Sequence, residues 1–536
     1  MLARVKSGAL MGVDAVVVEV EVDMSLGMPF FNVVGLPEGA VKESKVRVIS
    51  ALKNGGFTLP MKRITVNLAP ADLKKEGATF ELPIALGVLA AAGVIDHEPL
   101  QGYLFGGELA LDGALKPIRG VLPLALAARD GGFRGVMVPM ANAGEAALVD
   151  RIEVLAVESI TQAVMHFNGE ARIAPYDRSR PHISPVVDLN AVDMSEVRGQ
   201  QDVKDALEMA AAGGHNILLC GPPGSGKTML ARRLPGILPR MTFQEELEVT
   251  RIYSVLGLLS DGHSLIKERP FRSPHHTISD AGLVGGGPQT RPGELSMAHR
   301  GLLFLDELPE FRRHVLEVLR QPLEEGVVRL ARANHHVSYP CQVMLMAAMN
   351  PCPCGYYNVG EERLCTCGQT RVNDYFTRIS GPLLDRIDIS LTTRPVDVKL
   401  LSLGRREEKS SAWFRERVEA ARAVQAHRFR DDPGIYSNAQ MGPRLLALHA
   451  KTTASAVRML EKSVKAFGLS ARAHDRIIKM ARTRADLEGH DVVTDEDMNF
   501  AVGCRNLDRI GWMAGARPEA KSPWVRPAEP IKAPPR

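Results

Sequence analysis

One short segment constrains the fold more than any other part of the chain. Residues 216–228 read NILLCGPPGSGKT, which contains the complete pattern G-x-x-x-x-G-K-[ST] between an apolar stretch and a helical one. In such a strand–loop–helix unit, backbone N–H groups close around phosphates, and the helix N-terminus favours their negative charge. A chance glycine-rich turn would not need the strand and the helix, so we expect a nucleotide site. The residues of this phosphate loop are Gly221, Pro222, Pro223, Gly224, Ser225, Gly226, Lys227 and Thr228.

Within this loop, Lys227 would reach the β and γ phosphates, and Thr228 would ligate Mg²⁺. A second apolar segment, GLLFLDE at 301–307, ends in two carboxylates at the edge of the sheet where ligands of open α/β folds bind. We expect Asp306 to hold Mg²⁺, directly or through water, and Glu307 to polarise the attacking water. Buried strands that end in acids are common, but about eighty residues after a phosphate loop this one indicates nucleotide hydrolysis.

Three further residues are candidates for the same site, each with an ordinary structural alternative. Asn350 ends the apolar segment VMLMAAMN, where it could orient the water or could belong to a turn. Arg386, in GPLLDRIDIS, could be an arginine finger that acts on the ATP of a neighbouring subunit, or could form a surface ion pair. Arg472 lies in a basic helical segment and could fold back onto the same phosphate or be one of many surface cations. Side-chain chemistry alone leaves both arginines open.

The composition is that of an ordinary soluble globular protein. The 536 residues include 66 Lys and Arg against 62 Asp and Glu, a formal net charge of +4, and 45% are hydrophobic. These values exclude a wholly disordered chain, a collagen-like fibre and a small disulfide scaffold. The most apolar run, 82–95, is too short to span a membrane, and the N-terminus lacks the apolar core of a signal peptide. We therefore expect a cytoplasmic protein with no membrane segment.

Changes of pattern along the chain predict several domains. Residues 1–170 read as one α/β unit, in which VDAVVVEVEV, KRITVNLAP and FRGVMVP are strands, and VKESKVRVISALK and ELPIALGVLAAAG are helices. Three prolines and a lack of periodicity indicate a linker at 171–190. We expect a second α/β unit at 191–395, a helical region at 396–510, and a disordered Pro-rich tail at 511–536.

Four of the seven cysteines are crowded into residues 352–367. Cys352, Cys354, Cys365 and Cys367 form two C-x-C pairs that are separated by ten residues. Four thiolates can close a tetrahedral Zn²⁺ site. The more usual spacing is C-x-x-C, so four reduced loop thiols or a regulatory disulfide stay open as alternatives. We expect the other three cysteines, Cys220, Cys341 and Cys504, to be core residues.

The order of the motifs resembles that of the AAA+ ATPases. The segments RPFRSPHHTIS, GGGPQTRPGELSMAHRG and AAMNPCPCG are similar, more narrowly, to those of magnesium-chelatase-like AAA+ proteins of the ComM (YifB) family, and the resemblance extends over about residues 1–510. It implies a central P-loop α/β domain with a C-terminal helical lid. It also implies that Lys227 and Thr228 belong to Walker A, Asp306 and Glu307 to Walker B, Asn350 is sensor 1, Arg386 is the arginine finger and Arg472 is sensor 2.

The same resemblance implies a hexameric ring with ATP and Mg²⁺ as cofactors. Such a ring translocates on single-stranded and branched DNA and drives branch migration during recombination of incoming transforming DNA. Region 1–170 resembles the Lon-protease-type domain, whose fold is shared with the second domain of ribosomal protein S5. A Lon protease requires a Ser–Lys dyad, but Thr79 and Leu122 stand at the matching positions. Without a lysine base a hydroxyl is a poor nucleophile, so we expect a non-proteolytic scaffold.

Two insertions are candidates for DNA contacts. One is residues 267–299, rich in Gly, Pro and His, and the other is 324–340, which reads as a β-hairpin with Arg329, Arg332, His335 and His336 near its tip. Phosphate contacts bind DNA without reading its sequence, which suits a motor that moves over any DNA. The alternative is an ordinary hairpin surface.

Two other functions stay open. One is a chelatase-type motor that remodels a metal-insertion partner, although no porphyrin-sized site motif is present. The other is a scaffold in which ATP only holds a ring together, which would not need a water-activating carboxylate at Glu307.

Overall fold

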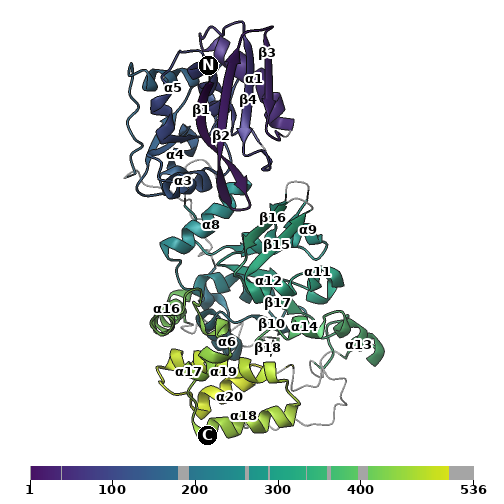
Figure 1. Ribbon diagram of the computed structural model, residues 1–536. Coiled ribbons are helices and arrows are strands. Elements are labelled where there is room, and N and C mark those ends of the chain that lie inside the picture. The colour runs from purple at the N-terminus through teal and green to yellow at the C-terminus, as the bar shows by residue number, and fades with distance from the viewer. Residues whose placement is uncertain are drawn as a thin grey trace, which may run out of the picture. The chain divides into compact units, whose positions relative to one another are not determined.

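The fold is known from a computed structural model that describes residues 2–37, 39–75, 77–178, 192–259, 265–287, 290–332, 335–358, 364–395, 409–505 and 507 (Figure 1). The predicted tail at 511–536 and residues 179–190 of the predicted linker lie outside this range. Contacts divide the chain into two compact units. The first comprises Met1–Val197, Thr228–Ala347 and Arg405–Glu419, and the second comprises Arg198–Lys227, Ala348–Gly404 and Ala420–Arg536.

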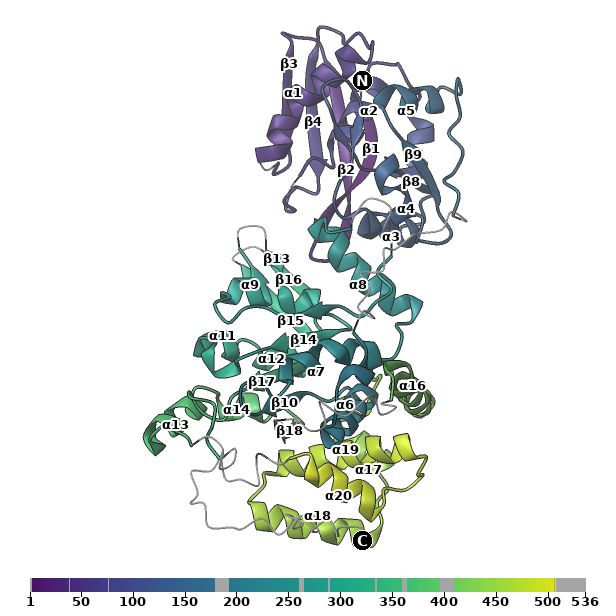
Figure 2. The ribbon, with the colours of Figure 1, turned by 180° about the vertical axis from the view of Figure 1, so that it is seen from behind.

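The first unit begins with a mixed seven-stranded sheet in the order β3-β4-β2-β1-β5-β8-β9 (Figure 2). Its centre is an antiparallel hairpin of β1 and β2, in register from Leu2 opposite Asp23 to Met11 opposite Asp14. The bounds are β1 (Leu2–Met11), β2 (Asp14–Ser25), β3 (Phe30–Val34), β4 (Arg63–Ala69), β5 (Tyr103–Phe105), β8 (Gly135–Pro139) and β9 (Glu153–Val157). The three predicted strands are confirmed as β2, β4 and β8.

Helices cover both faces of this sheet. Val18, Val20 and Val22 of β2 pack into one core with helices α1 (Gly39–Asn54), α2 (Glu81–Ala91) and α5 (Ile160–Phe167). Val17, which points to the opposite face, packs into a second core with α3 (Val121–Asp130) and α4 (Ala143–Ala146). Every residue of α2 is buried, which explains why its sequence is apolar all round rather than on one stripe.

A second, parallel sheet has the order β11-β14-β17-β10-β18. Three of its strands, β10, β14 and β17, are buried at every residue, so they read as continuous apolar runs instead of alternating. Strand β10 leads directly into the predicted phosphate loop and then into helix α7 (Lys227–Arg233). The strands are β10 (Ile217–Cys220), β11 (Phe271–Arg272), β14 (Leu302–Leu305), β17 (Met344–Met349) and β18 (Ile389–Thr392).

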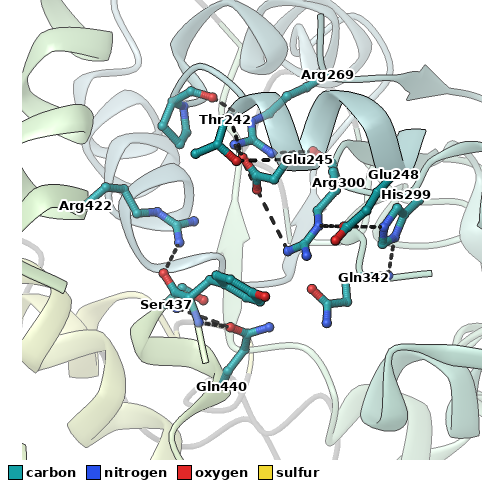
Figure 3. Close-up of polar contacts among 12 residues, drawn as sticks. Thr242, Glu245, Glu248, Arg269, His299, Arg300, Gln342, Arg422, Ser437 and Gln440 are labelled. Atoms are coloured by element: carbon teal, nitrogen blue, oxygen red, sulfur yellow. Dashed lines mark hydrogen bonds and ion pairs between the residues drawn. The ribbon is translucent and has the colours of Figure 1, made fainter. Parts of the chain in front are cut away.

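Helix α8 (Phe243–Leu256) anchors the start of β14 through a partly buried ionic network (Figure 3). Arg300, two residues before β14, donates from Nε to Glu248 Oε2 at 2.9 Å, and His299 Nε2 lies 3.2 Å from the same oxygen. Burial would raise the pKa of Glu248, but the hydrogen bonds from His299 and Arg300 lower that pKa to about 2. Glu245, which closes the capping box of α8, also pairs with Arg269 at 3.2 Å. The strand that carries the predicted acids is therefore held at its first residues.

Helix α8 also packs on the N-terminal sheet domain within the same compact unit. Ser254 of α8 donates a short hydrogen bond to the buried carboxylate of Glu145, and the backbone N–H of Gly120 donates to Ser254 O at 3.1 Å. The turn between β1 and β2 lies against a second hairpin, because a Cβ built on Gly12 would stand 2.9 Å from Val337 Cγ1. This second hairpin is the predicted one, formed by β15 (Val327–Arg332) and β16 (His335–Pro340).

The C-terminal part of the chain is helical, as predicted. Helix α16 (Ser411–Arg428) is followed by α17 (Pro443–His449), α18 (Ala454–Phe467), α19 (Ala471–Glu488) and α20 (Asp495–Gly503). No helix among the described residues is both long and apolar enough to cross a membrane.

Candidate nucleotide site

The phosphate loop has the backbone that its glycines permit. Gly224 and Gly226 have φ values of 77° and 82°, in the left-handed region that favours glycine. At Gly221 the reason for glycine is space, because a Cβ there would lie 2.1 Å from Thr393 Oγ1. Ser225 Oγ is 2.8 Å from the same threonine oxygen, which ties the loop to the residue after β18.

Lys227 is buried and held by the loop itself. Its ammonium donates to Gly221 O at 2.8 Å, to Pro222 O at 3.0 Å and to Asn350 Oδ1 at 3.2 Å. Asn350, directly after β17, thus lies beside the lysine that would meet the β and γ phosphates. Phosphate oxygens could replace these three acceptors, so the amide of Asn350 is placed to respond to a bound nucleotide.

Thr228 and Asp306 face each other. The hydroxyl of Thr228 donates to Asp306 Oδ2 at 2.7 Å, and Asp306 Oδ1 accepts from the backbone N–H of Glu307 at 2.9 Å. A hydroxyl and a carboxylate are hard oxygen ligands of the kind that Mg²⁺ prefers. These two oxygen atoms therefore already lie together where both could ligate one metal ion.

Glu307 is exposed and has an unusual backbone. Its φ is 52°, and its side chain is 55% accessible. Glu307 Oε2 lies 3.4 Å from Nδ1 of His276, and the ring of His276 packs edge-on against Phe311 at 6.4 Å. His276 lies in the segment RPFRSPHHTIS and in the first insertion, but no motif or spacing predicted its contact with Glu307. Its contact links that insertion to the carboxylate predicted to activate water.

The two candidate arginines, Arg386 and Arg472, are linked through Asp385, which directly precedes Arg386 in the sequence. Arg472, the second residue of α19, is 70% exposed, and its Nη1 lies 3.8 Å from Asp385 Oδ2. Arg386 donates from Nη1 to Pro382 O at 2.7 Å, while its own carbonyl accepts from Asn216 Nδ2 at 2.9 Å. The backbone of Arg386 is thereby tied to the residue before β10.

Asp388 joins the sheet to the helical region. Its Oδ2 lies 3.3 Å from His215 Nδ1 and accepts from the backbone N–H of Asn216 at 3.2 Å, and its Oδ1 pairs with Arg476 of α19 at 3.2 Å. Burial would raise the pKa of Asp388, but His215, Arg476 and Lys479 lower it below its usual value. The second unit therefore holds α19 to β18 through a carboxylate that is ionised at neutral pH.

The four clustered cysteines lie together at the end of β17. Their sulfur atoms are all within 4.8 Å of one another, Cys352 is buried, and all four are free thiols. Cys220, Cys341 and Cys504 are buried, as core residues would be. For Cys220, burial raises the thiol pKa, the nearby Lys227 lowers it and the nearby Cys352 raises it.

Comparison with known proteins covers nearly the whole chain. The family described as magnesium chelatase, subunit ChlI, matches residues 193–401, and two related families described as subunit ChlI of Mg-chelatase and as its C-terminal part match 20–142 and 408–505. Competence protein ComM of Haemophilus influenzae is 42% identical over 95% of this chain and 98% of its own. The uncharacterized protein YifB of Escherichia coli is 41% identical over the same two shares. The magnesium-chelatase 38 kDa subunit of Rhodobacter capsulatus is 24% identical over 32% of this chain and 54% of its own.

Proposed function

Because this chain belongs to the ComM (YifB) family of magnesium-chelatase-like proteins, we propose that it is an ATP-driven motor that acts on DNA. The observation that carries the proposal is the 2.7 Å hydrogen bond between Thr228 and Asp306, whose oxygens are of the kind that ligate Mg²⁺. Thr228 directly follows Lys227, and Asp306 directly precedes Glu307. The word "competence" in the name of the Haemophilus influenzae relative supports a role in recombination of DNA taken up by natural transformation.

In this proposal each side chain of the site has one task. Lys227 binds the β and γ phosphates, while Thr228 and Asp306 hold Mg²⁺. Glu307 polarises the attacking water and Asn350 orients it, because phosphoryl transfer depends mainly on positioning and charge neutralisation. ATP and Mg²⁺ are the proposed cofactors, and Zn²⁺ is a third candidate at the cysteine cluster.

In this proposal Arg386 and Arg472 make ATP hydrolysis depend on assembly of the ring. Arg386 acts as the finger on the ATP of the next subunit in a homohexameric ring, and Arg472 approaches the phosphate from the helical lid. The pairing of Arg472 with Asp385, the residue directly before Arg386, supports this reading, since it brings the start of α19 to the segment that carries Arg386. A finger supplied by a neighbouring subunit makes hydrolysis sensitive to ring closure.

The proposed DNA contacts lie on the β15–β16 hairpin and on the insertion at 267–299. Arg329 of β15 is exposed and pairs with Glu325, four residues earlier, so a DNA phosphate could replace Glu325 as the partner of this guanidinium. Arg332 and His335 were predicted beside it, but their side chains lie outside the described set. His276, which contacts Glu307, offers a route from the insertion to hydrolysis.

The remaining regions take supporting tasks in the proposal. Residues 1–170 form a non-proteolytic Lon-like scaffold, because Leu122, at the position expected for a lysine base, is fully buried and apolar. Residues 191–395 form the ATPase core, 396–510 the lid, 171–190 a linker and 511–536 a tail.

The alternative function is a chelatase-type motor that remodels a metal-insertion partner. The similarity to the Rhodobacter capsulatus magnesium-chelatase subunit favours it, but that similarity covers only 32% of this chain. The two functions differ in what accelerates hydrolysis, which is DNA for the first and a partner protein for the second.

The test is the rate of ATP hydrolysis with no DNA and with single-stranded, duplex and forked DNA. We expect stimulation, strongest with forked DNA, and a loss of at least about 100-fold in turnover for Glu307→Gln, because a positioned base contributes that much. ATP binding should persist in Glu307→Gln and be lost in Lys227→Ala. The matched control is Glu310→Gln, a nearby exposed carboxylate, which should hydrolyse ATP normally. Unchanged turnover in Glu307→Gln would reject the site, and hydrolysis indifferent to all three DNAs would reject the DNA motor.

A further inference from the structure

The four clustered sulfur atoms lie at separations that a single tetrahedral ion would impose. Cys352 Sγ is 3.3 Å from Cys354 Sγ and 3.6 Å from Cys365 Sγ, and Cys354 Sγ is 3.5 Å from Cys365 Sγ. All four sulfurs, including that of Cys367, lie within 4.8 Å of one another. With Zn–S bonds of about 2.3 Å, a tetrahedral site places its sulfurs about 3.8 Å apart. The three separations above, 3.3 to 3.6 Å, are slightly shorter than that value, and the other separations are no more than 4.8 Å.

Other forces give a weaker account of this convergence. The shortest of these separations, 3.3 Å, is far from the ~2.05 Å of a disulfide. Thiols are weak hydrogen-bond donors and acceptors, so they do little to gather two chain segments that lie ten residues apart. The backbone N–H of Cys367 donates to Cys365 Sγ at 3.4 Å, the kind of outer contact that supports a metal-bound thiolate.

The first cysteine pair is flanked by two residues that touch the phosphate loop. Two positions before Cys352, the amide oxygen of Asn350 accepts from Lys227 at 3.2 Å. Directly after Cys354 comes Gly355, whose φ is 88°, and a Cβ built on it would stand 2.5 Å from Cδ of Pro223. The turn 350–355 therefore packs against the phosphate loop at both of its ends, with the two cysteines between them.

The second pair belongs to a different element. Cys365 and Cys367 lie just before helix α13 (Gln369–Thr377). An ion shared by both pairs would tie the turn after β17 to the start of this helix, and so would restrain the turn. The backbone N–H of Gly355 also donates to Cys352 O at 2.9 Å, which closes the turn around the first pair.

We propose that Cys352, Cys354, Cys365 and Cys367 bind one structural Zn²⁺, and that this ion holds the turn 350–355 against the phosphate loop so that Asn350 is aligned for hydrolysis. The metal site stands on the sulfur geometry alone, whereas its effect on hydrolysis rests on the proposed ATPase function. Metal loss should lower turnover more than nucleotide affinity, because Lys227 keeps the carbonyls of Gly221 and Pro222 as separate supports.

The first experiment measures metal in the full chain, purified under reducing conditions without chelators. We expect close to one zinc per chain by elemental analysis, and release of that zinc when a mercurial reagent titrates the thiols. Exchange for Co²⁺ should give the thiolate charge-transfer and visible bands of a tetrahedral sulfur site. Absence of zinc, or stoichiometric iron in its place, would overturn the assignment whatever the ATPase rates are.

The second experiment compares cysteine variants. Cys365→Ser should lose the metal, and its ATP turnover should fall about tenfold, which is the usual cost of removing contacts that support a site. A fluorescent ATP analogue should still bind. Cys341→Ala, a buried cysteine outside the cluster, should keep both metal and turnover. Normal turnover in a folded, metal-free Cys365→Ser protein would overturn the proposed effect of the metal on hydrolysis. The proposed zinc site itself would still stand.

Two glycine variants distinguish the effect of the metal on hydrolysis from the effect of the turn. Gly355→Ala should retain zinc but lose ATP turnover, because its φ is strained for alanine and the new methyl group meets Pro223. Gly368→Ala is the matched control, since it is next to Cys367 and a Cβ there meets nothing within 4 Å. Identical turnover in the two alanine variants would show that the turn does not position the site.

Discussion

Glu307 combines an active-site carboxylate with a strained backbone. Its φ of 52° costs a residue with a Cβ about 1–2 kcal/mol relative to glycine. Glu307 is the second residue after β14, next to Asp306. Strain of this kind persists where the surrounding structure imposes it, and it is common at functional sites.

This strain leads to a prediction that is independent of catalysis. Without nucleotide, Glu307→Gly should unfold about 2 °C above Glu307→Ala, because glycine adopts the left-handed conformation freely and the difference is about 1 kcal/mol. The measurement is the thermal unfolding midpoint of each full-length variant. At Glu310, in the turn Leu308–Glu310 that follows, the order should reverse, with alanine above glycine. The same order at both positions would contradict the strain.

At the scale of elements, local patterns predicted much of the fold. The strand of the phosphate loop, the strand that ends in Asp306 and the five elements quoted from the N-terminal region were all predicted from apolar runs and periodicity. Strand β1 was not predicted. It contains Gly8, which a Cβ could not replace because Leu124 Cδ1 lies 2.6 Å away, and one of its two neighbours, β5, follows about ninety residues later. Such pairing depends on distant chain segments, which a local pattern does not contain.

The residues of the candidate site also divide into those that local patterns predicted and those that depend on distant segments of the chain. Lys227, Thr228, Asp306 and Glu307 follow from two contiguous motifs, each of which includes its own strand. His276 reaches Glu307 only because a loop from a different part of the sheet passes over it. The partly buried network of Glu248, His299 and Arg300 likewise joins residues about fifty positions apart. Neither the spacing nor the periodicity of the sequence predicts these contacts between distant residues.

The contact between β18 and α19 gives a prediction for pH dependence. Asp388→Asn should lower the free energy of unfolding of the second unit by about 3 kcal/mol at neutral pH, because it leaves Arg476 without its buried partner. The pKa of Asp388 is lowered in the folded state, so its contribution is complete above the usual pKa of 3.8 and is lost as the pH falls below that value. The difference from wild type should therefore shrink on acidification.

The measurement is denaturant unfolding of wild type and variant in a pH series from neutral to about pH 3. Asp385→Asn is the control, because its 3.8 Å pair with Arg472 is exposed and should contribute within about 0.5 kcal/mol. A difference between wild type and Asp388→Asn that stays constant across the series would contradict the ionised state of Asp388.

At the scale of the whole molecule, the proposed ring can be tested by mixing two inactive variants and measuring ATP hydrolysis. Arg386→Ala and Lys227→Ala chains should each be inactive, but rings assembled from equal amounts should recover up to about a quarter of wild-type hydrolysis. Random mixing places an intact Lys227 next to an intact Arg386 at about that fraction of interfaces. The measurement is ATPase rate against mixing ratio.

The control for mixing replaces the Lys227→Ala partner with the double variant Lys227→Ala/Arg386→Ala, which should restore nothing. An Arg386→Ala protein that assembles and hydrolyses ATP normally would move the finger to another arginine. Arg378, which follows the last residue of α13, is then the next candidate.

The contact of Gly12 with Val337 decides where this protein can carry a dye or a tether for single-molecule work. The turn at Gly12 is closed to insertion, because it already touches β16. The next turn of the same sheet, around Gly27, has almost fully exposed neighbours in Leu26 and Met28. Maleimide chemistry would attack the four clustered thiols first, so a short enzymatic tag at Gly27 is the attachment that leaves both the hairpin and the cysteines undisturbed.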